Sequence, residues 1–319
     1  MSDYVSLADL TLAYEKTVIV SSLNLDIRKG ELIALLGPSG CGKTTTMRAI
    51  AGLLTPRSGR ISIDGKDVTR VSPSKREVGL VFQSYALFPH LSVFENVAFG
   101  LRLRREKELE AKVMAGLETV GLTDFAKRQP ADLSGGQQQR VSLARSLVMQ
   151  PKVLLLDEPL SNLDARLRLE MRTELQRVQK ETGVTMVFVT HDQSEALALA
   201  DRIVLMREGE IEQLGSPEEI YNHPVSGFAA DFMGFETILP DERGGGLAWR
   251  PSAVILGSGS HQGEIRGASF AGERREYVLT SELGVIKAER PVDEAPYEIG
   301  QKVAFDLPEN TAVQLARVD

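Results

Sequence analysis

Short apolar runs that end in polar residues recur along the first part of this 319-residue chain. Four of them read GELIALLG (30–37), VGLVFQ (78–83), KVLLLDEP (152–159) and GVTMVFVTHD (183–192). Unbroken runs of this kind are typical of strands buried on both faces of a sheet. They predict four core strands, each followed at once by side chains that can do chemistry.

Amphipathic stretches lie between these runs. Helices are predicted from about residue 106 to 120, after Ser134 up to Pro151, over 165–182 and over 194–200. Strands that alternate with helices favour a parallel sheet covered by helices. Ligands of such sheets bind beyond the carboxyl ends of the strands. The predicted strand ends carry Gln83, Asp157, Glu158 and His191, and a glycine-rich loop begins at Gly37.

The hydrophobic pattern changes near residue 235. Beyond it, short alternating runs are separated by glycine-bearing turns, as in RGGGLAWRPSAVILG (243–257) and RREYVLTSELGVIKAE (274–289). This pattern predicts a small all-β barrel. We therefore expect two domains, an α/β domain over 1–235 with a helical part at about 85–150, and a β-domain over 236–319.

Composition limits the function classes. The net charge of −7 does not favour a sequence-independent nucleic-acid surface, so no nucleic-acid partner is expected. The one cysteine, Cys41, excludes an internal disulfide and a multi-cysteine metal site, and fits a reducing compartment. We see no signal peptide and no apolar run near the ~20 residues that cross a bilayer. Any membrane association is therefore expected to go through a partner.

The loop GPSGCGKTT (37–45) has the spacing G-x-x-x-x-G-K-T between a predicted strand and a predicted helix. Glycines let the backbone turn several N–H groups inward, and the helix N-terminus adds a partial positive charge, so the loop suits phosphates. Lys43 supplies charge for the β- and γ-phosphates, and the Thr44 hydroxyl suits Mg²⁺. The loop alone predicts binding of a nucleoside triphosphate, and its predicted binding residues are Gly37, Pro38, Ser39, Gly40, Cys41, Gly42, Lys43, Thr44 and Thr45.

Other polar groups are expected beside this loop. Asp157 suits Mg²⁺, and Glu158 is placed to orient and deprotonate a water molecule. His191, at another strand end, could hold an oxygen of the γ-phosphate. A second glycine-rich loop, LSGGQ (133–137), opens a helix, and SNLD (161–164) follows the acidic pair.

Taken together and in this order, these motifs strongly resemble the nucleotide-binding subunit of ABC transporters over about residues 4–235. The resemblance implies Walker A at 37–44, Walker B at 153–157, a D-loop at 161–164 and a switch histidine at His191. It also implies that Tyr14 stacks on adenine and that Gln83 links Mg²⁺ and water to the membrane partner. The signature residues Ser134, Gly135, Gly136 and Gln137 would contact the γ-phosphate bound on a second copy of the chain.

The tail resembles the TOBE-type domain, an OB-like fold, of ATPases that serve binding-protein-dependent importers. The central motifs are similar to the branch that imports polyamines, ferric iron, phosphonate or sulfate. The resemblance implies a homodimer at the cytoplasmic face of the inner membrane, bound to permease subunits and working indirectly with an extracytoplasmic solute-binding protein. The segment after Gln83 would form a socket for a permease helix, through apolar and aromatic side chains: Tyr85, Leu87, Phe88, Leu91, Val93, Phe94 and Phe99.

Three alternatives to this function were weighed. The chain could energise a sugar importer, because SNLDA also occurs among those proteins. It could be a soluble ABC-type ATPase of DNA repair or translation, although Lys43 and Asp157 are only 114 positions apart (157 − 43), without heptads or a zinc module. A phosphotransferase or GTPase has no role for LSGGQ. The transported solute, the permease and any ligand of the tail are not encoded in these motifs.

Overall fold

The computed structural model describes residues 4–318, and the chain divides into two compact units, Met1–Pro217 and Glu218–Asp319. The change of pattern at residue 235 falls inside the second unit, because that unit begins with helical turns rather than strands. These are α7 (Pro217–Asn222), at the division itself, and α8 (Gly227–Phe232). Among the described residues, no helix is both long and apolar enough to cross a membrane.

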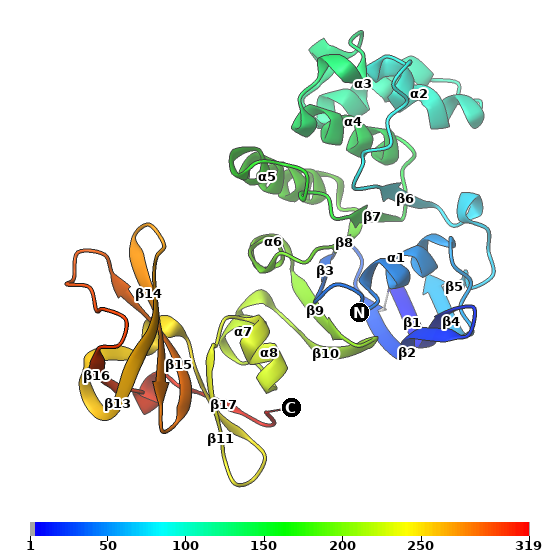
Figure 1. Ribbon diagram of the computed structural model, residues 1–319. Helices are drawn as coiled ribbons and strands as arrows, with labels where there is room; N and C mark the ends of the chain where they lie inside the picture. The colour runs from blue at the N-terminus through cyan, green and yellow to red at the C-terminus, as the bar shows by residue number, and fades with distance from the viewer. Residues whose placement is uncertain (1–3, 319) are drawn as a thin grey trace. The chain divides into compact units, whose positions relative to one another are not determined.

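A six-stranded sheet forms the centre of the first unit (Figure 1). Its order is β10 (Glu210–Gly215), β9 (Arg202–Arg207), β3 (Leu32–Leu36), β8 (Thr185–Val189), β7 (Val153–Asp157) and β6 (Val78–Val81). The strands from β9 to β6 are parallel, and β10 pairs antiparallel with β9. β3 and β8 are buried along their whole length, as their unbroken apolar composition predicts.

A second, antiparallel sheet packs with the first around helix α1 (Lys43–Ala51). Its order is β2 (Thr17–Ile27), β1 (Val5–Tyr14), β4 (Ser58–Ile63) and β5 (Lys66–Asp67). α1 contacts strands of both sheets, and its side chains Met47 and Ile50 belong to the core that the two sheets share. This burial fixes the helix whose first turn carries Lys43 and Thr44.

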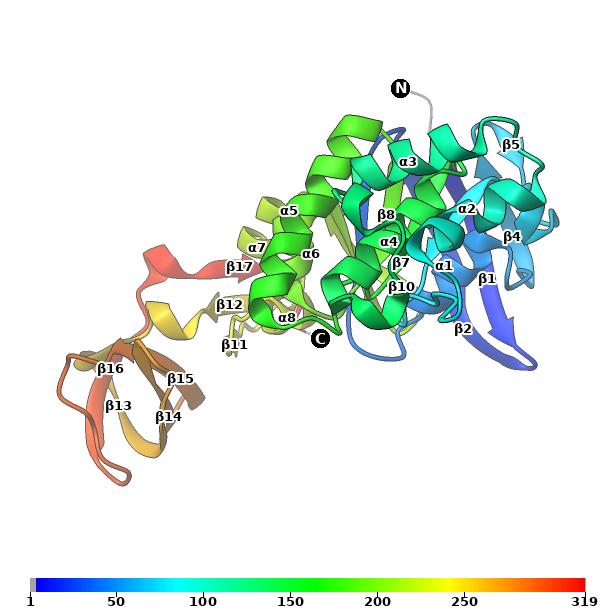
Figure 2. The ribbon, with the colours of Figure 1, turned by 90° about the horizontal axis from the view of Figure 1, so that it is seen from above.

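The predicted helical part is present in the first unit. Helices α2 (Val93–Leu103), α3 (Leu109–Thr119) and α4 (Gly135–Leu147) pack on one another and lie together at one end of the unit (Figure 1). Ser92 and Glu95 form a capping box at the start of α2. Helices α5 (Ala165–Thr182) and α6 (Gln193–Leu199) are in contact with each other, as Figure 2 shows. Short 3₁₀ turns complete the unit: η1 (Pro73–Lys75), η2 (Thr123–Phe125) and η3 (Pro130–Asp132).

The strands of the second unit form two antiparallel sheets, which confirms the all-β character predicted for the tail. One sheet has the order β11 (Thr237–Pro240), β12 (Gly246–Trp249) and β17 (Val313–Leu315). The other has the order β15 (Gly284–Pro291), β14 (Arg274–Ser281), β13 (Ile255–Phe270) and β16 (Lys302–Asp306), and the 3₁₀ turns are η4 (Pro251–Ala253) and η5 (Glu309–Thr311). Their shared core includes Tyr277 and Phe305, and Trp249 Nε1 donates to the Pro308 carbonyl at 3.0 Å.

Candidate functional site

The glycine-rich loop joins the end of β3 to the start of α1. Gly37 has a φ of 146°, and a Cβ there would lie 2.3 Å from the Met206 carbonyl oxygen. Gly42 has a φ of 102°, and a Cβ would lie 2.6 Å from Val20 Cγ2. Only glycine fits both positions, because backbone conformation and space exclude a side chain. The loop is thereby held close to the chain around it.

Lys43 folds back over this loop. Its Nζ donates to the carbonyls of Gly37 at 2.7 Å and Pro38 at 2.8 Å, and the residue is 6% exposed. Gly42, the N-cap of α1, gives no side-chain cap, and the first turn carries no acidic residue. The first-turn N–H groups and the ammonium together suit an anion at this end of the helix.

A cavity of about 340 Å³ adjoins the loop. We call this 340 Å³ cavity the P-loop pocket; it is lined by Tyr14, Ile19, Ser39, Gly40, Gly42, Lys43, Thr44, Thr45 and Glu158. Cys41 is 3% exposed and belongs to the core cluster, so its thiol faces away from solvent. Gly37 and Pro38 contribute to the loop's conformation rather than to this lining.

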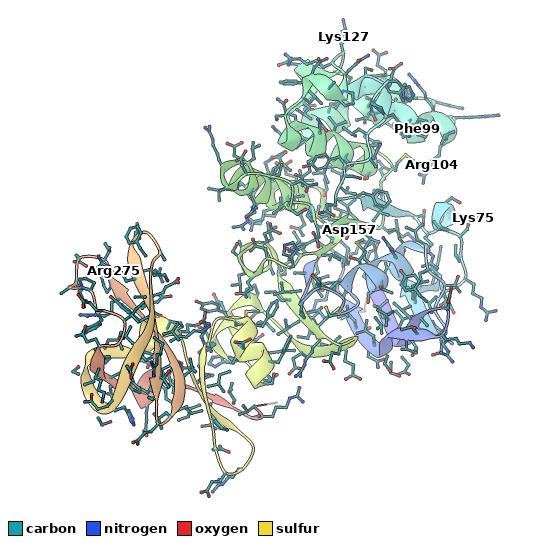
Figure 3. The ribbon with its side chains drawn as sticks, in the orientation of Figure 1. Lys75, Phe99, Arg104, Lys127, Asp157 and Arg275 are labelled. Atoms are coloured by element: carbon teal, nitrogen blue, oxygen red, sulfur yellow. The ribbon has the colours of Figure 1, made fainter. Side chains whose placement is uncertain are left out.

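Thr44 and Asp157 lie side by side at the bottom of the site. The Thr44 hydroxyl donates to Asp157 Oδ1 at 3.3 Å. Burial raises the pKa of Asp157, the charge of Glu158 adds to this, and the hydrogen bond from Thr44 opposes it. Figure 3 labels Asp157 within the first unit, at the end of β7. A hard divalent cation at these two oxygens would favour the ionised carboxylate and so offset the cost of burial.

Glu158 is the point where three loops meet. Its Oε1 lies 3.3 Å from His191 Nδ1, and its Oε2 accepts from Gln83 Nε2 at 3.4 Å. Gln83 Nε2 also donates to Ser161 Oγ at 3.0 Å. The φ of Glu158 is 44°, a left-handed conformation that costs a residue other than glycine about 1–3 kcal/mol. The structure therefore brings together the four strand-end side chains that the sequence predicted at one edge.

The signature residues lie elsewhere. Ser134 caps α4, since its Oγ accepts from Gln137 N at 3.4 Å while Ser134 N donates to Gln137 Oε1 at 2.9 Å. Ser134 is exposed, whereas Gly136 is buried. Within the described part of the chain, Ser134, Gly135, Gly136 and Gln137 do not line the P-loop pocket.

Two residues beside the pocket were not predicted from the sequence. Ile19 lines it from β2, and Arg48 Nη1 donates to the Tyr14 hydroxyl at 3.5 Å. Arg48 stands five positions after Lys43 on α1, about 1.4 turns further along the helix and on another face, so the spacing of the motif does not single it out. Ile19 carries no sequence signal of its own.

A second hollow, of 700 Å³, lies beside α2, and we call it the α2 groove. Phe82, Phe99 and Leu103 line it and are exposed to 41%, 39% and 74%. Figure 3 labels Phe99 on α2 and Arg104, the C-cap residue directly after it, and both line the groove. Of the apolar side chains predicted to form a socket, Phe88 and Phe99 line this groove, while Val93 is fully buried.

The comparisons with known proteins agree on one kind of protein. A model of the ABC transporter family matches residues 20–161. The Fe(3+) ions import ATP-binding protein FbpC of Agrobacterium fabrum is 48% identical, over 84% of this chain and 85% of that protein. The spermidine/putrescine import ATP-binding protein PotA of Mesoplasma florum is 51% identical, over 75% of this chain and 69% of that protein.

Solved structures show the same fold. The structure of cbiO1 from Clostridium perfringens, part of the ABC transporter complex cbiONQ, is similar with a TM-score of 0.65 and 34% identity, covering 69% of this chain and 91% of that one. A dimeric structure of the ATP-binding cassette MJ0796 bound to ADP and Pi is similar with a TM-score of 0.59 and 32% identity, covering 67% of this chain and 98% of that one.

Proposed function

Since this chain belongs to the ATP-binding subunits of ABC transporters, we propose that it hydrolyses Mg²⁺-ATP in a homodimer to drive ferric-ion import through a membrane permease. The chain is an ATPase that energises solute import, and it has the ABC-type P-loop fold followed by all-antiparallel β-sheets. The observation that carries the chemistry is the convergence of Gln83, Glu158 and His191 beside the pocket that Lys43 and Thr44 line.

Phosphoryl transfer to water depends mostly on positioning and on stabilising charge. Lys43 and the first-turn N–H groups of α1 hold the β- and γ-phosphates, and Tyr14 stacks on the adenine. Thr44, Asp157 and Gln83 would hold Mg²⁺, and the bound ion would supply positive charge that offsets the charge of the phosphates. No cluster of three or more His, Cys, Asp or Glu ligands occurs in residues 4–318, so the remaining ligands would be water and phosphate oxygens.

Glu158 orients the attacking water and accepts its proton. His191, 3.3 Å away, keeps the carboxylate in place and reaches the γ-phosphate oxygen. The strained backbone of Glu158 supports this role, because strain of this kind persists only where the surroundings hold it, and functional sites concentrate it.

The site is completed by a second copy of the chain. Ser134, Gly135, Gly136 and Gln137 stand apart from the P-loop pocket of their own chain but present the start of a 13-residue helix, a natural anion site. In a head-to-tail dimer this helix would close over the ATP held by the partner's P-loop. The solved dimer of a related ATP-binding cassette is consistent with such an arrangement.

The permease docks in the α2 groove. Burying two or three of the exposed side chains Phe82, Phe99 and Leu103 contributes about 1.5–3 kcal/mol each, enough to hold a short apolar helix. The groove connects to the site, because Arg145 lines it and donates to the carbonyls of Tyr85 and Ala86, two and three residues beyond Gln83. The chain therefore acts at the cytoplasmic face of the inner membrane as a peripheral subunit, and the extracytoplasmic solute-binding protein reaches it only through the permease.

Our choice of ferric iron as the transported solute is based on the similar proteins. The ferric-ion import proteins match 84% to 88% of this chain, which extends further than the match to the polyamine import protein. Deleting the gene should abolish ATP-dependent uptake of radioactive ferric iron and leave spermidine uptake unchanged. The reverse result would assign the subunit to polyamine import.

The hydrolytic assignment is tested with Glu158→Gln, which keeps the shape of the side chain and removes the base. Hydrolysis should fall about 10²–10⁴-fold while ATP binding survives. Glu210→Gln, the same substitution at an exposed position of β10, is the matched control and should hydrolyse ATP normally. Near-normal turnover by Glu158→Gln would reject this role for Glu158.

A further inference from the structure

Two loops that touch the site are joined to each other by an ion pair between a half-buried arginine and a buried glutamate, which has no role in the function proposed above. One is the Ser161–Asp164 loop, whose Ser161 holds Gln83. The other is the segment Thr190–Asp192, whose His191 faces Glu158. Arg168 on α5 and Glu195 on α6 lie between them.

Glu195 is hydrogen-bonded to the segment Thr190–Asp192, which we call the histidine loop. Its side chain is 4% exposed, and its Oε2 accepts a hydrogen bond from Thr190 Oγ1 at 2.7 Å, directly before His191. Burial raises the pKa of Glu195, and the hydrogen bond from Thr190 and the charge of Arg168 oppose this. A carboxylate buried this deeply needs a cationic partner to remain charged.

Arg168 supplies that partner and reaches both loops. Its Nε lies 3.6 Å from Glu195 Oε1, its Nη1 lies 3.7 Å from Asp192 Oδ2, and its Nη2 donates to the Leu163 carbonyl at 3.2 Å. One planar guanidinium thus contacts both the Ser161–Asp164 loop, at Leu163, and the histidine loop, at Asp192. One turn along α5, Arg172 Nη2 donates to Ser194 Oγ at 2.7 Å and fixes the start of α6 in the same way.

The Arg168–Glu195 ion pair is close to forming a further hydrogen bond. Among the described residues, the buried Nε of Arg168 has no hydrogen-bond partner, and its 3.6 Å separation from Glu195 Oε1 exceeds the usual N–H···O range by about 0.4 Å. A small shift of α5 or of the histidine loop would complete the bond. The position of one loop is therefore coupled to the position of the other.

We propose that Arg168 and Glu195 are positioning residues for ATP hydrolysis, which hold His191 in register with the Ser161–Asp164 loop and so with Glu158. This inference rests on the proposed roles of Glu158 and His191. Neither Arg168 nor Glu195 touches the nucleotide in this scheme. They act through the backbone of Leu163 and the hydroxyl of Thr190, so their loss changes the rate of the chemical step more than the binding of ATP.

The test compares Glu195→Gln and Arg168→Lys with Arg166→Ala. Glu195→Gln keeps an acceptor for Thr190 but removes the charge that pairs with Arg168, and Arg168→Lys keeps the charge but loses the fork that reaches Leu163. Arg166 lies on the same helix, its side chain is 90% exposed, and it pairs with Glu170. Single-turnover hydrolysis of labelled ATP, the ATP dissociation constant and the melting temperature are measured for each.

We expect Glu195→Gln and Arg168→Lys to lower the hydrolysis rate about 10- to 100-fold, as a small misplacement of a catalytic group does, with ATP affinity changed less than about 2-fold. Arg166→Ala should behave as the unmodified chain. In a His191→Ala background, Glu195→Gln should reduce the rate little further, because residues that act through one another are not additive.

A normal rate in both variants, or an equal loss with and without His191, would overturn the inference, as would a rate loss that only follows a lowered melting temperature. The proposed function is judged separately by Glu158→Gln. If that variant loses hydrolysis while Glu195→Gln does not, the function stands and the positioning role fails. If Glu158→Gln hydrolyses ATP normally, the assignment of the site itself fails.

Discussion

Tyr14 is 44% exposed at the P-loop pocket, and its hydroxyl accepts from Arg48 at 3.5 Å. An aromatic ring left this open is poorly explained by core packing, but it offers a face to a base. Stacking of a base on an aromatic side chain contributes about 1–3 kcal/mol. We therefore predict that Tyr14 contacts the nucleotide through its ring rather than through its hydroxyl.

Tyr14→Ala should weaken ATP binding roughly 5- to 150-fold, the equivalent of that stacking energy, whereas Tyr14→Phe should bind ATP nearly as well as the unmodified chain. Val18→Ala, a truncation at an equally exposed position of the same hairpin, is the control. Fluorescent ATP-analogue titration measures all three. If Tyr14→Phe and Tyr14→Ala weaken ATP binding equally, the effect comes from the hydroxyl and its hydrogen bond with Arg48.

At the scale of the element, α1 depends on a buried arginine at its carboxyl end. Arg76 is 3% exposed, and its guanidinium donates to the carbonyls of Ala49, Ile50, Val71 and Thr69. Two of these, Ala49 and Ile50, are carbonyls of the last turn of α1, and the Ala49 carbonyl also accepts from the Gly52 N–H at 3.1 Å. Burial lowers the pKa of Arg76, but an arginine remains charged in proteins. The helix that carries Lys43 is thus fixed at its far end by one side chain.

Arg76→Ala leaves several buried carbonyls without a partner and should destabilise the first unit by about 3 kcal/mol. For a unit of this size that lowers the melting temperature by roughly 6–12 °C. Lys75→Ala, at the exposed neighbour labelled in Figure 3, should leave it unchanged. A melting temperature unaltered in Arg76→Ala would show that water replaces the guanidinium at these carbonyls.

Helix α2 also carries the exposed side chains of the α2 groove, which we propose binds the permease. Phe99→Asp places a charge at an exposed position of the groove, so the subunit should fold and bind ATP normally but fail to assemble with the permease. Leu169→Asp, at an exposed leucine of α5 outside the groove, should assemble. Co-purification with the permease from membranes measures both. Full assembly of Phe99→Asp would remove α2 from the interface.

At the scale of the whole molecule, Ser134 does not line the P-loop pocket of its own chain, so a dimer can place a mutated Ser134 and a mutated Lys43 in the same site or in different sites. Ser134→Arg and Lys43→Ala are each expected to inactivate both sites of their own homodimer. In a mixed dimer, one site carries both lesions and the other carries neither, so one site regains normal groups. Mixing the two inactive chains should therefore restore measurable hydrolysis, assayed against each variant alone. No recovery, with mixed dimers shown to form, would contradict a site shared between two chains.

The sequence by itself determined the parallel sheet, the P-loop and the strand ends that carry Gln83, Asp157, Glu158 and His191. Unbroken apolar runs specify buried strands, and the glycine spacing of the loop is fixed by backbone conformations that other residues do not adopt. The expected division at residue 235 differed from the structure because α7 and α8 precede the strands that the pattern detects. Only the tertiary structure placed Ile19 at the pocket, gathered four carbonyls around Arg76 and joined Arg168 to Glu195. Contacts of this kind join elements distant in sequence, and no local period or motif records which side chains of two packed elements will meet.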